Sequence, residues 1–327
     1  MVSSALSDLL PVGGLDFLSG LTGMAERNQA PEALPWVQPQ ASLHKLTTFR
    51  VGGPADWLAT PRSLEEMRAT LHWATAAQLS ITLLGAGSNL LISDGGIRGL
   101  VICTRRVRKT EFNEAQGQIT VAAGEPLPTV AWKVAKRGWR GLEWAAGIPG
   151  TIGGAVVMNA GAHGGCTAER LVSATVLDPH QGVMQLAPEA LGFRYRTSSL
   201  QESGAVVLEA TLQLEPDHDP AAVVADTLAG LEQRRATQPY DAPSCGSVFR
   251  NPYPHTAGWL IEQAGLKGYR LGQAQVAQRH ANFILNCGGA TASDIHRLIR
   301  HVQEQVESQW SLWLKPEVRF MGEFPAL

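Results

Sequence analysis

The sequence has few cysteines, and their positions exclude two kinds of site. Cys103, Cys166, Cys245 and Cys287 are the four in 327 residues, and no two of them lie close together. A zinc site built on closely spaced cysteines is therefore excluded, and no disulfide framework is indicated. Because unpaired cysteines fit a reducing compartment, we expect a cytoplasmic protein.

Long apolar runs and long basic runs are also missing. No apolar segment reaches the roughly 20 residues that a membrane-spanning helix needs, so no membrane partner is expected. The net charge is −2, and the most basic run, residues 105–109, is too short for a nucleic-acid footprint. No Lys or Arg precedes Arg27, which argues against a secretory signal or a transit peptide. Nothing in the sequence implies a protein partner.

Glycine, in contrast, is concentrated in the middle of the chain. Seven glycines fall in residues 147–165, interleaved with Ile148, Ile152 and Val156, so the segment can be buried. Glycine lets the backbone approach a ligand closely, and the N–H groups of such turns can bind phosphate oxygens. A tightly turning core loop explains this composition equally well, so the segment alone leaves both interpretations open.

A second glycine turn favours the ligand interpretation. Residues 81–84 predict a buried strand, and a phosphate-sized turn follows it at 85–90. The turn matches the dinucleotide fingerprint only in part, because Leu90 stands at the third glycine position and no helix follows. With a third glycine turn at 51–54, the pattern predicts a long ligand with a diphosphate, held by loops rather than by a helix dipole.

Strand and helix patterns are mixed along the chain. Ser63 and Glu66 predict a capping box at the start of a helix, which with strands at 56–60 and 81–84 gives a βαβ unit with a parallel strand pair. Further strands are expected at 99–103, 173–177, 205–214 and 313–321, and helices at 128–137 and 221–235. A last helix is predicted by one apolar stripe: Ile295, Leu298, Ile299, Val302, Val306 and Trp310.

Proline-rich and polar segments divide the chain into three expected regions. Residues 1–38 are predicted to form a weakly ordered extension. A polar, proline-bounded junction at 214–220 then separates a region at 39–218, with subdomains at about 39–104 and 105–218, from a C-terminal domain at 219–327.

Three polar segments, at 193–199, 243–252 and 315–320, interrupt otherwise apolar sequence. Each contains a residue that could take part in catalysis and that also has an ordinary structural explanation. Arg196 could form a surface ion pair, Ser247 could cap a turn, and Glu317 could face solvent. Taken singly, these residues favour the structural explanations.

Seven segments together resemble one family, that of UDP-N-acetylmuramate dehydrogenase, also called UDP-N-acetylenolpyruvoylglucosamine reductase. They occur in the family's order over residues 40–323: 49–54, 85–90, 147–161, 195–196, 246–249, 280–283 and 316–320. The resemblance implies an α+β fold, with an FAD-binding region of the vanillyl-alcohol-oxidase (PCMH) type and a C-terminal α/β substrate domain. It implies a bacterial peptidoglycan enzyme in which NADPH reduces noncovalent FAD. The reduced FAD then reduces UDP-N-acetylenolpyruvoylglucosamine to UDP-N-acetylmuramate.

The resemblance also implies catalytic roles that suit this chemistry. Hydride delivery to the enolpyruvyl double bond pushes electrons toward the adjacent carboxylate, so a cation and an acid are needed there. By resemblance, Arg196 holds the carboxylate, and Glu317 shares a proton with the intermediate, which requires a raised pKa. Ser247 would protonate the ether-bearing carbon.

The remaining site residues also come from the resemblance, and no metal is expected. FAD is expected to contact the glycine turns and their neighbours: Arg50, Gly52, Gly53, Gly85, Ala86, Gly87, Ser88, Asn89, Leu90, Gly147, Pro149, Gly150, Gly153, Gly154, Asn159 and Gly161. The residues expected beside the substrate are Tyr195, Arg235, Lys267, Gln278, Asn282 and Arg319, whose ordinary structural explanations stay open.

The spacing of the motifs points to one subclass of the family. Only 50 residues lie between Arg196 and Ser247, which resembles the shorter subclass without the tyrosine-bearing insertion, so Tyr195 is given no lid role. His163 is interpreted as an ordinary loop residue, because FAD in the family is noncovalent. Two alternatives remain: an FAD-linked oxidase of the same fold, and a non-catalytic relative that binds sugar nucleotides.

Overall fold

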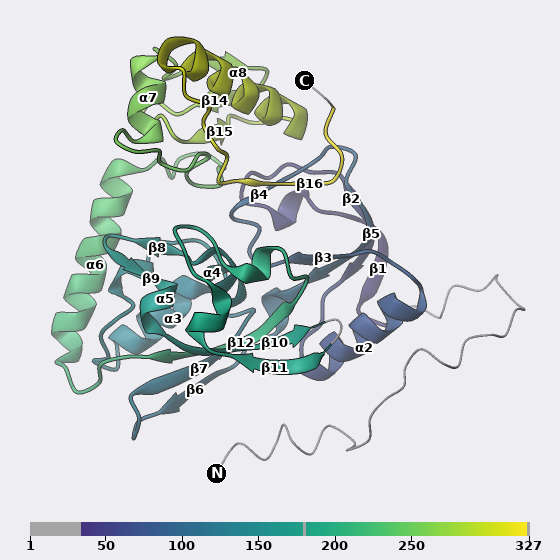
Figure 1. Cartoon of the computed structure of the whole chain (residues 1–327), viewed down its shortest axis with the longest axis vertical. Coiled ribbons are helices and arrows are strands. Elements are labelled where there is room, and N and C mark those ends of the chain that lie inside the picture. Colours follow the sequence, from purple (N-terminus) through teal and green to yellow (C-terminus); the bar gives the residue numbers. More distant parts are fainter. Residues whose placement is uncertain (1–33, 179–180, 326–327) are drawn as a thin grey trace, which may run out of the picture. The chain divides into compact units, whose positions relative to one another are not determined.

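The computed structural model describes residues 34–178 and 181–325, which form mixed helices and sheets (Figure 1). The first sheet has the order β1-β2-β5-β3, in which β1 (Val37–Ser42) is antiparallel to β2 (Pro54–Ala59). The predicted βαβ unit is present with β3 (Ile81–Leu84), but its two strands are not direct neighbours. β5 (Ile97–Cys103) lies between them and pairs in parallel with both.

The helix of this unit, α2 (Leu64–Ala76), begins at the predicted cap, but the capping box is only half formed. The side chain of Ser63 accepts a hydrogen bond from the Glu66 N–H at 3.1 Å. The Glu66 carboxylate accepts from the N–H of Arg62 at 2.6 Å rather than from that of Ser63. Met67 and Trp73 of this helix are buried in one apolar cluster with residues of the sheet, which holds the helix against it.

The second sheet is antiparallel throughout, with the order β11-β10-β12-β7-β6. Its strands are β6 (Thr110–Asn113), β7 (Gln118–Ala122), β10 (Leu171–Asp178), β11 (Gly182–Leu186) and β12 (Val206–Gln213). Two helices, α3 (Leu127–Ala135) and α4 (Ile152–Met158), share one apolar core with it. The predicted strands at 173–177 and 205–214 and the helix at 128–137 are thereby confirmed, each with small shifts at the ends.

The C-terminal region contains α7 (Ala257–Gln263), α8 (Ala292–Trp310) and a three-stranded sheet of β13 (Arg270–Leu271), β14 (Ala274–Val276) and β15 (Ile284–Asn286). The long helix α6 (Pro220–Thr237) connects it to the preceding region (Figure 1). The apolar stripe of α8 is buried as predicted, except that Trp310 is 37% exposed. Phe49, Val51 and Leu91, from the N-terminal half, belong to the core of this region.

The last strand, β16 (Arg319–Met321), is shorter than the predicted 313–321 and pairs in parallel with β4 (Leu90–Ile92). The chain that leaves the 85–90 turn is thus hydrogen-bonded to the C-terminal end of the fold. The expected extension at 1–38 lies mostly outside the described residues, and its boundary falls inside β1. No helix in the described part of the chain is both long enough and apolar enough to cross a membrane.

Candidate active site

The turn at 85–89 connects β3 to β4, and one arginine side chain holds it through hydrogen bonds. Arg105 donates from Nε to the Gly85 oxygen at 2.9 Å and from Nη2 to the Ala86 and Leu46 oxygens, both at 2.5 Å. A Cβ at Gly87, where φ is +62°, would lie 2.1 Å from the Leu46 oxygen. Glycine is therefore required at Gly87 both for the backbone angle and for the close approach.

The second glycine segment lies against this turn. Ser88 Oγ donates to the Pro149 oxygen at 2.6 Å, and a Cβ at Gly85 would lie 2.7 Å from Thr151 Oγ1. The segment is not all loop as we predicted, because Thr151 caps the short helix α4 through the N–H of Gly154. The side chain of Thr151 satisfies that N–H, and apolar residues at every third or fourth position then favour the helix.

The third glycine turn, at 51–54, has a structural explanation that needs no ligand. A Cβ at Gly53 would lie 2.1 Å from the Asp94 oxygen, and one at Gly52 would lie 2.9 Å from Ile92 Cβ. Gly153 is also closely packed, with Ala123 Cβ 2.9 Å from its Cβ position, whereas the nearest atom to that of Gly150 is 3.8 Å away. Of these glycines, Gly150 is the one whose backbone has free space beside it.

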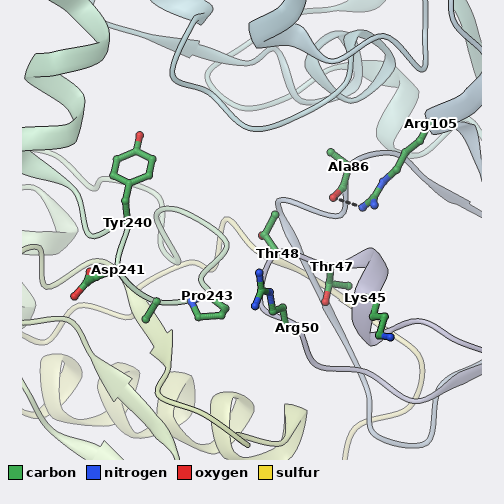
Figure 2. A pocket seen from close by; sticks show the side chains of 10 residues that line it. Lys45, Thr47, Thr48, Arg50, Ala86, Arg105, Tyr240, Asp241 and Pro243 are labelled. Carbon is green, nitrogen blue, oxygen red and sulfur yellow. Dashed lines mark hydrogen bonds between the residues drawn. The ribbon is translucent and has the colours of Figure 1, made fainter.

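A pocket of about 640 Å³ adjoins the 85–89 turn (Figure 2). Tyr240 and Pro243 line one side, and Thr48 and Arg50 line the other, near the hydrogen bond from Arg105 to Ala86. The remaining lining residues are Lys45, Thr47, Asp241 and Ala242. The lining contains three cations, Lys45, Arg50 and Arg105, and a single carboxylate, Asp241, so the pocket attracts anions.

The structure brings Arg196 and Glu317 together. Arg196 Nε donates to Glu317 Oε1 at 2.9 Å, and its Nη2 donates to the Gly161 oxygen at 2.8 Å. The side chains are only 23% and 14% exposed. A solvent-facing Glu317 and an exposed ion pair are therefore both wrong, and the pair lies in a partly desolvated position.

Burial controls the ionisation of Glu317. It raises the pKa of this carboxyl above its ordinary value, while the ion pair with Arg196 and the charge of Arg250 oppose the rise without cancelling it. Burial and the nearby Glu317 charge also raise the pKa of the Cys245 thiol, which stays protonated. The raised pKa of Glu317 is what a carboxyl needs to carry a transferable proton.

Ser247 lies on the segment next to Glu317. Phe249 forms a β-bridge with Pro316, and the Glu317 N–H donates to the Val248 oxygen at 2.7 Å. Gly246 has φ +82°, and a Cβ there would meet no atom within 4 Å. The space beside Ser247 is therefore open on the side where glycine precedes it.

Asn282 and Asn159, predicted to contact the substrate and FAD respectively, form hydrogen bonds to the main chain of the segments that carry Ser247 and Arg196. Asn282 is buried and clamps Phe249, accepting from its N–H at 2.9 Å and donating to its oxygen at 2.8 Å. Asn159 is buried too, and donates to the Arg194 oxygen at 3.1 Å. Both amides therefore hold, through the backbone, the segments that carry Arg196 and Ser247.

The other residues predicted to contact the substrate are exposed or, in the case of Lys267, paired with another side chain. Lys267 is paired with Glu262 at 2.7 Å, whereas Arg235, Gln278 and Arg319 are exposed. Tyr195 is 54% exposed, and the Arg196 guanidinium lies 5.1 Å from the centre of its ring. Of these five residues, Tyr195 contacts the Arg196–Glu317 pair through its ring.

Three arginines with clear structural positions were missed by the sequence analysis. Arg105 holds the 85–89 turn, and Arg250 acts electrostatically on Glu317. Arg234 packs against Gly147, whose Cβ would lie 2.6 Å from its Cδ. The Nε atoms of Arg234 and Arg250 are buried without a hydrogen-bond partner. The basic runs at 105–109 and 234–235 were visible, but nothing in the sequence distinguishes a buried arginine from a solvated one.

Known proteins resemble this chain along most of its length. The family model for "FAD binding domain" matches residues 55–186, and that for "UDP-N-acetylenolpyruvoylglucosamine reductase, C-terminal domain" matches 238–321. UDP-N-acetylenolpyruvoylglucosamine reductases from a Nostoc species and from Synechocystis are 58% and 56% identical over 290 residues. These alignments cover 89% and 88% of this chain and 88% and 92% of the relatives. The crystal structure of UDP-N-acetylenolpyruvylglucosamine reductase from Thermus caldophilus, 34% identical, matches with a TM-score of 0.73 and covers 88% of this chain and 98% of that one.

Proposed function

This chain belongs to the UDP-N-acetylenolpyruvoylglucosamine reductase family, and we propose how its residues carry out that reaction. It is an FAD-containing oxidoreductase that uses NADPH to reduce the enolpyruvyl ether of UDP-N-acetylglucosamine to UDP-N-acetylmuramate, in peptidoglycan precursor synthesis. FAD, when bound, carries hydride from NADPH to the enolpyruvyl double bond. We assign FAD to residues 39–218 and the sugar nucleotide to 219–327, which the placement of the two family models supports.

The glycine segments and the arginines around them suit a diphosphate. Gly150 has free space beside its backbone, and Arg234 has a buried Nε without a partner next to Gly147. An unpaired buried donor is costly, so a ligand oxygen at this position would be stabilising. We assign the FAD diphosphate to the turns at 85–89 and 147–150, with Arg234 as an additional donor that reaches this site from helix α6 of the C-terminal region. The cationic pocket beside the first turn adds a favourable field.

Arg196 is assigned to the substrate carboxylate. Two of its five N–H donors bond to Glu317 and Gly161, which leaves donors for a planar carboxylate. The pair is held before substrate arrives, so little reorganisation is needed when negative charge grows on the carboxylate. Tyr195, whose ring lies beside the Arg196 guanidinium, would pack against the same part of the substrate.

Glu317 and Ser247 are assigned to the proton steps. Because its pKa is raised, Glu317 can hold a proton and share it with the carboxylate as that group gains charge. Ser247 then gives its hydroxyl proton to the ether-bearing carbon, which is strongly basic at that stage. The absence of a side chain at Gly246 would let the sugar approach the hydroxyl.

The observation that carries this proposal is the half-buried pair of Arg196 and Glu317. We place the reaction in the cytoplasm, which is supported by four unpaired cysteine thiols. The purified protein is expected to be yellow and to oxidise NADPH only when the UDP-enolpyruvyl sugar is present. Sustained turnover of a small alcohol or acid would favour the FAD-linked oxidase, and binding without turnover would favour a non-catalytic relative.

A further inference from the structure

The 85–89 turn is bonded directly to the residue that carries the catalytic carboxyl. Asn89 Nδ2 donates to the main-chain oxygen of Glu317 at 3.0 Å. The N–H of Arg319 donates to the main-chain oxygen of Asn89, also at 3.0 Å. One residue of the turn therefore holds the backbone on both sides of Val318, across 228 positions of sequence in the case of the bond to Glu317.

The strands that follow extend this connection. Leu90 of β4 pairs with Arg319 of β16, and the Ser93 N–H donates to the Met321 oxygen at 2.9 Å. The chain that leaves the turn is thus bonded along its length to the chain that follows Glu317. A displacement of the turn must therefore displace the Glu317 main chain.

Arg196 is tied to the other glycine segment in a comparable way. Its Nη2 donates to the oxygen of Gly161, which belongs to the segment assigned to FAD. Each member of the Arg196–Glu317 pair is therefore bonded to a different segment of the flavin site. This arrangement gives the flavin site a direct mechanical connection to the catalytic pair.

We propose that Asn89 is a positioning residue that couples occupancy of the flavin site to the placement of the Glu317 carboxyl. The inference rests on the proposed function, because it takes the 85–89 turn as part of the flavin site. A cofactor that immobilises the turn restricts Glu317 through the two hydrogen bonds of Asn89, and such coupling is reciprocal. The acid is then held more firmly when the hydride carrier is present.

Hydrogen exchange of the full chain, with and without saturating FAD, tests this coupling. In the wild type, FAD should slow exchange about tenfold in residues 85–92 and also in 315–321. Asn89→Ala removes the side-chain bond to Glu317 but keeps the main-chain bonds between β4 and β16, so FAD should still protect 85–92 but slow exchange in 315–321 clearly less than in the wild type. Asn113→Ala is the matched control, because it removes a side-chain bond to Gln116 in an exposed turn outside these segments, and it should keep the tenfold effect on 315–321.

The outcomes separate the coupling from the flavin-site assignment. Equal protection of 315–321 in Asn89→Ala and wild type would overturn the coupling, as would a wild-type segment that FAD does not protect. Failure of FAD to protect 85–92 would overturn the assignment of the flavin site and the coupling with it. In the holoenzyme, Asn89→Ala should slow oxidation of the reduced flavin by the enolpyruvyl sugar about tenfold, and more than it slows reduction by NADPH. Equal slowing of both half-reactions would contradict the coupling.

Discussion

Arg196 and Glu317 are 121 residues apart in sequence, yet Arg196 Nε and Glu317 Oε1 lie 2.9 Å apart in the structure. Arg196 is held in the left-handed backbone region, with φ +55°, in a tight turn where Arg194 and Thr197 form a β-bridge. A non-glycine residue in this region is uncommon and costs backbone energy. The surrounding bonds therefore hold the guanidinium against Glu317 at the expense of backbone strain.

The first prediction concerns how FAD is held. The proposed FAD-binding site consists of main-chain groups in two glycine turns and of arginine side chains. None of these groups forms a covalent bond to a flavin. Denaturation with acid should release the flavin completely into the supernatant, where its absorbance is measured. Yellow precipitated protein would show a covalent link and favour the oxidase alternative.

The second prediction concerns Arg105. Arg105→Lys keeps the charge but cannot make three fixed bonds to the oxygens of Gly85, Ala86 and Leu46. Hydrogen bonds from charged donors contribute about 1.5–3 kcal/mol each, so losing part of this set should weaken FAD binding at least about tenfold. The dissociation constant can be measured from quenching of flavin fluorescence. Arg106→Lys, at an exposed neighbouring position, is the control and should bind FAD as the wild type does.

Local patterns were sufficient to predict most single elements. The apolar stripe of α8 and the cap at Ser63 depend on residues close in sequence, so their spacing alone indicates them. The strand neighbours were not predictable in the same way. β5 lies between β2 and β3, and no local pattern records which strand occupies the centre of a sheet.

The site was predictable from a family resemblance but not from its residues alone. Arg196 and Glu317 look like surface charges until the fold brings them together and buries them. Asn282 was expected beside the substrate, and the sequence did not indicate that its amide clamps the Phe249 backbone. The glycines at 52 and 53 looked similar to those at 85 and 87, but close packing against Ile92 and Asp94 is enough to require them. Such distinctions depend on long-range contacts.

The third prediction separates the two half-reactions. Ser247→Ala removes the proposed proton donor without touching the flavin turns, so NADPH should reduce the flavin at nearly the wild-type rate. Oxidation of the reduced flavin by the enolpyruvyl sugar should slow by about 100-fold or more, the usual range for loss of a general acid. Stopped-flow absorbance of the flavin resolves both steps. If both steps slow to the same degree, Ser247 supports the fold or the flavin instead.

The fourth prediction concerns the pH dependence of Glu317. Burial raises its pKa, and Arg250 lowers it, so Arg250→Met should raise the pKa further. Because the acid works when protonated, the oxidative half-reaction is lost as pH rises through this pKa. The descending limb of its pH profile should therefore move to higher pH in Arg250→Met. Lys315→Met removes an exposed cation from the segment that carries Glu317, and it should leave the pH of the descending limb unchanged. A limb that stays fixed or moves to lower pH in Arg250→Met would refute the role of Arg250.

The most direct test of the account is the turnover of Glu317→Gln. Glutamine keeps the shape of the side chain but has no transferable proton. Loss of that proton should slow the steps that follow the start of hydride transfer. We predict that kcat falls by about 100-fold to 10,000-fold, with a smaller change in affinity for the enolpyruvyl sugar. Glu323→Gln, at an exposed position of the same C-terminal segment, should be unaffected. A Glu317→Gln enzyme whose kcat lies within a factor of about three of wild type would contradict the account, since even a tenfold loss reflects only about 1.4 kcal/mol.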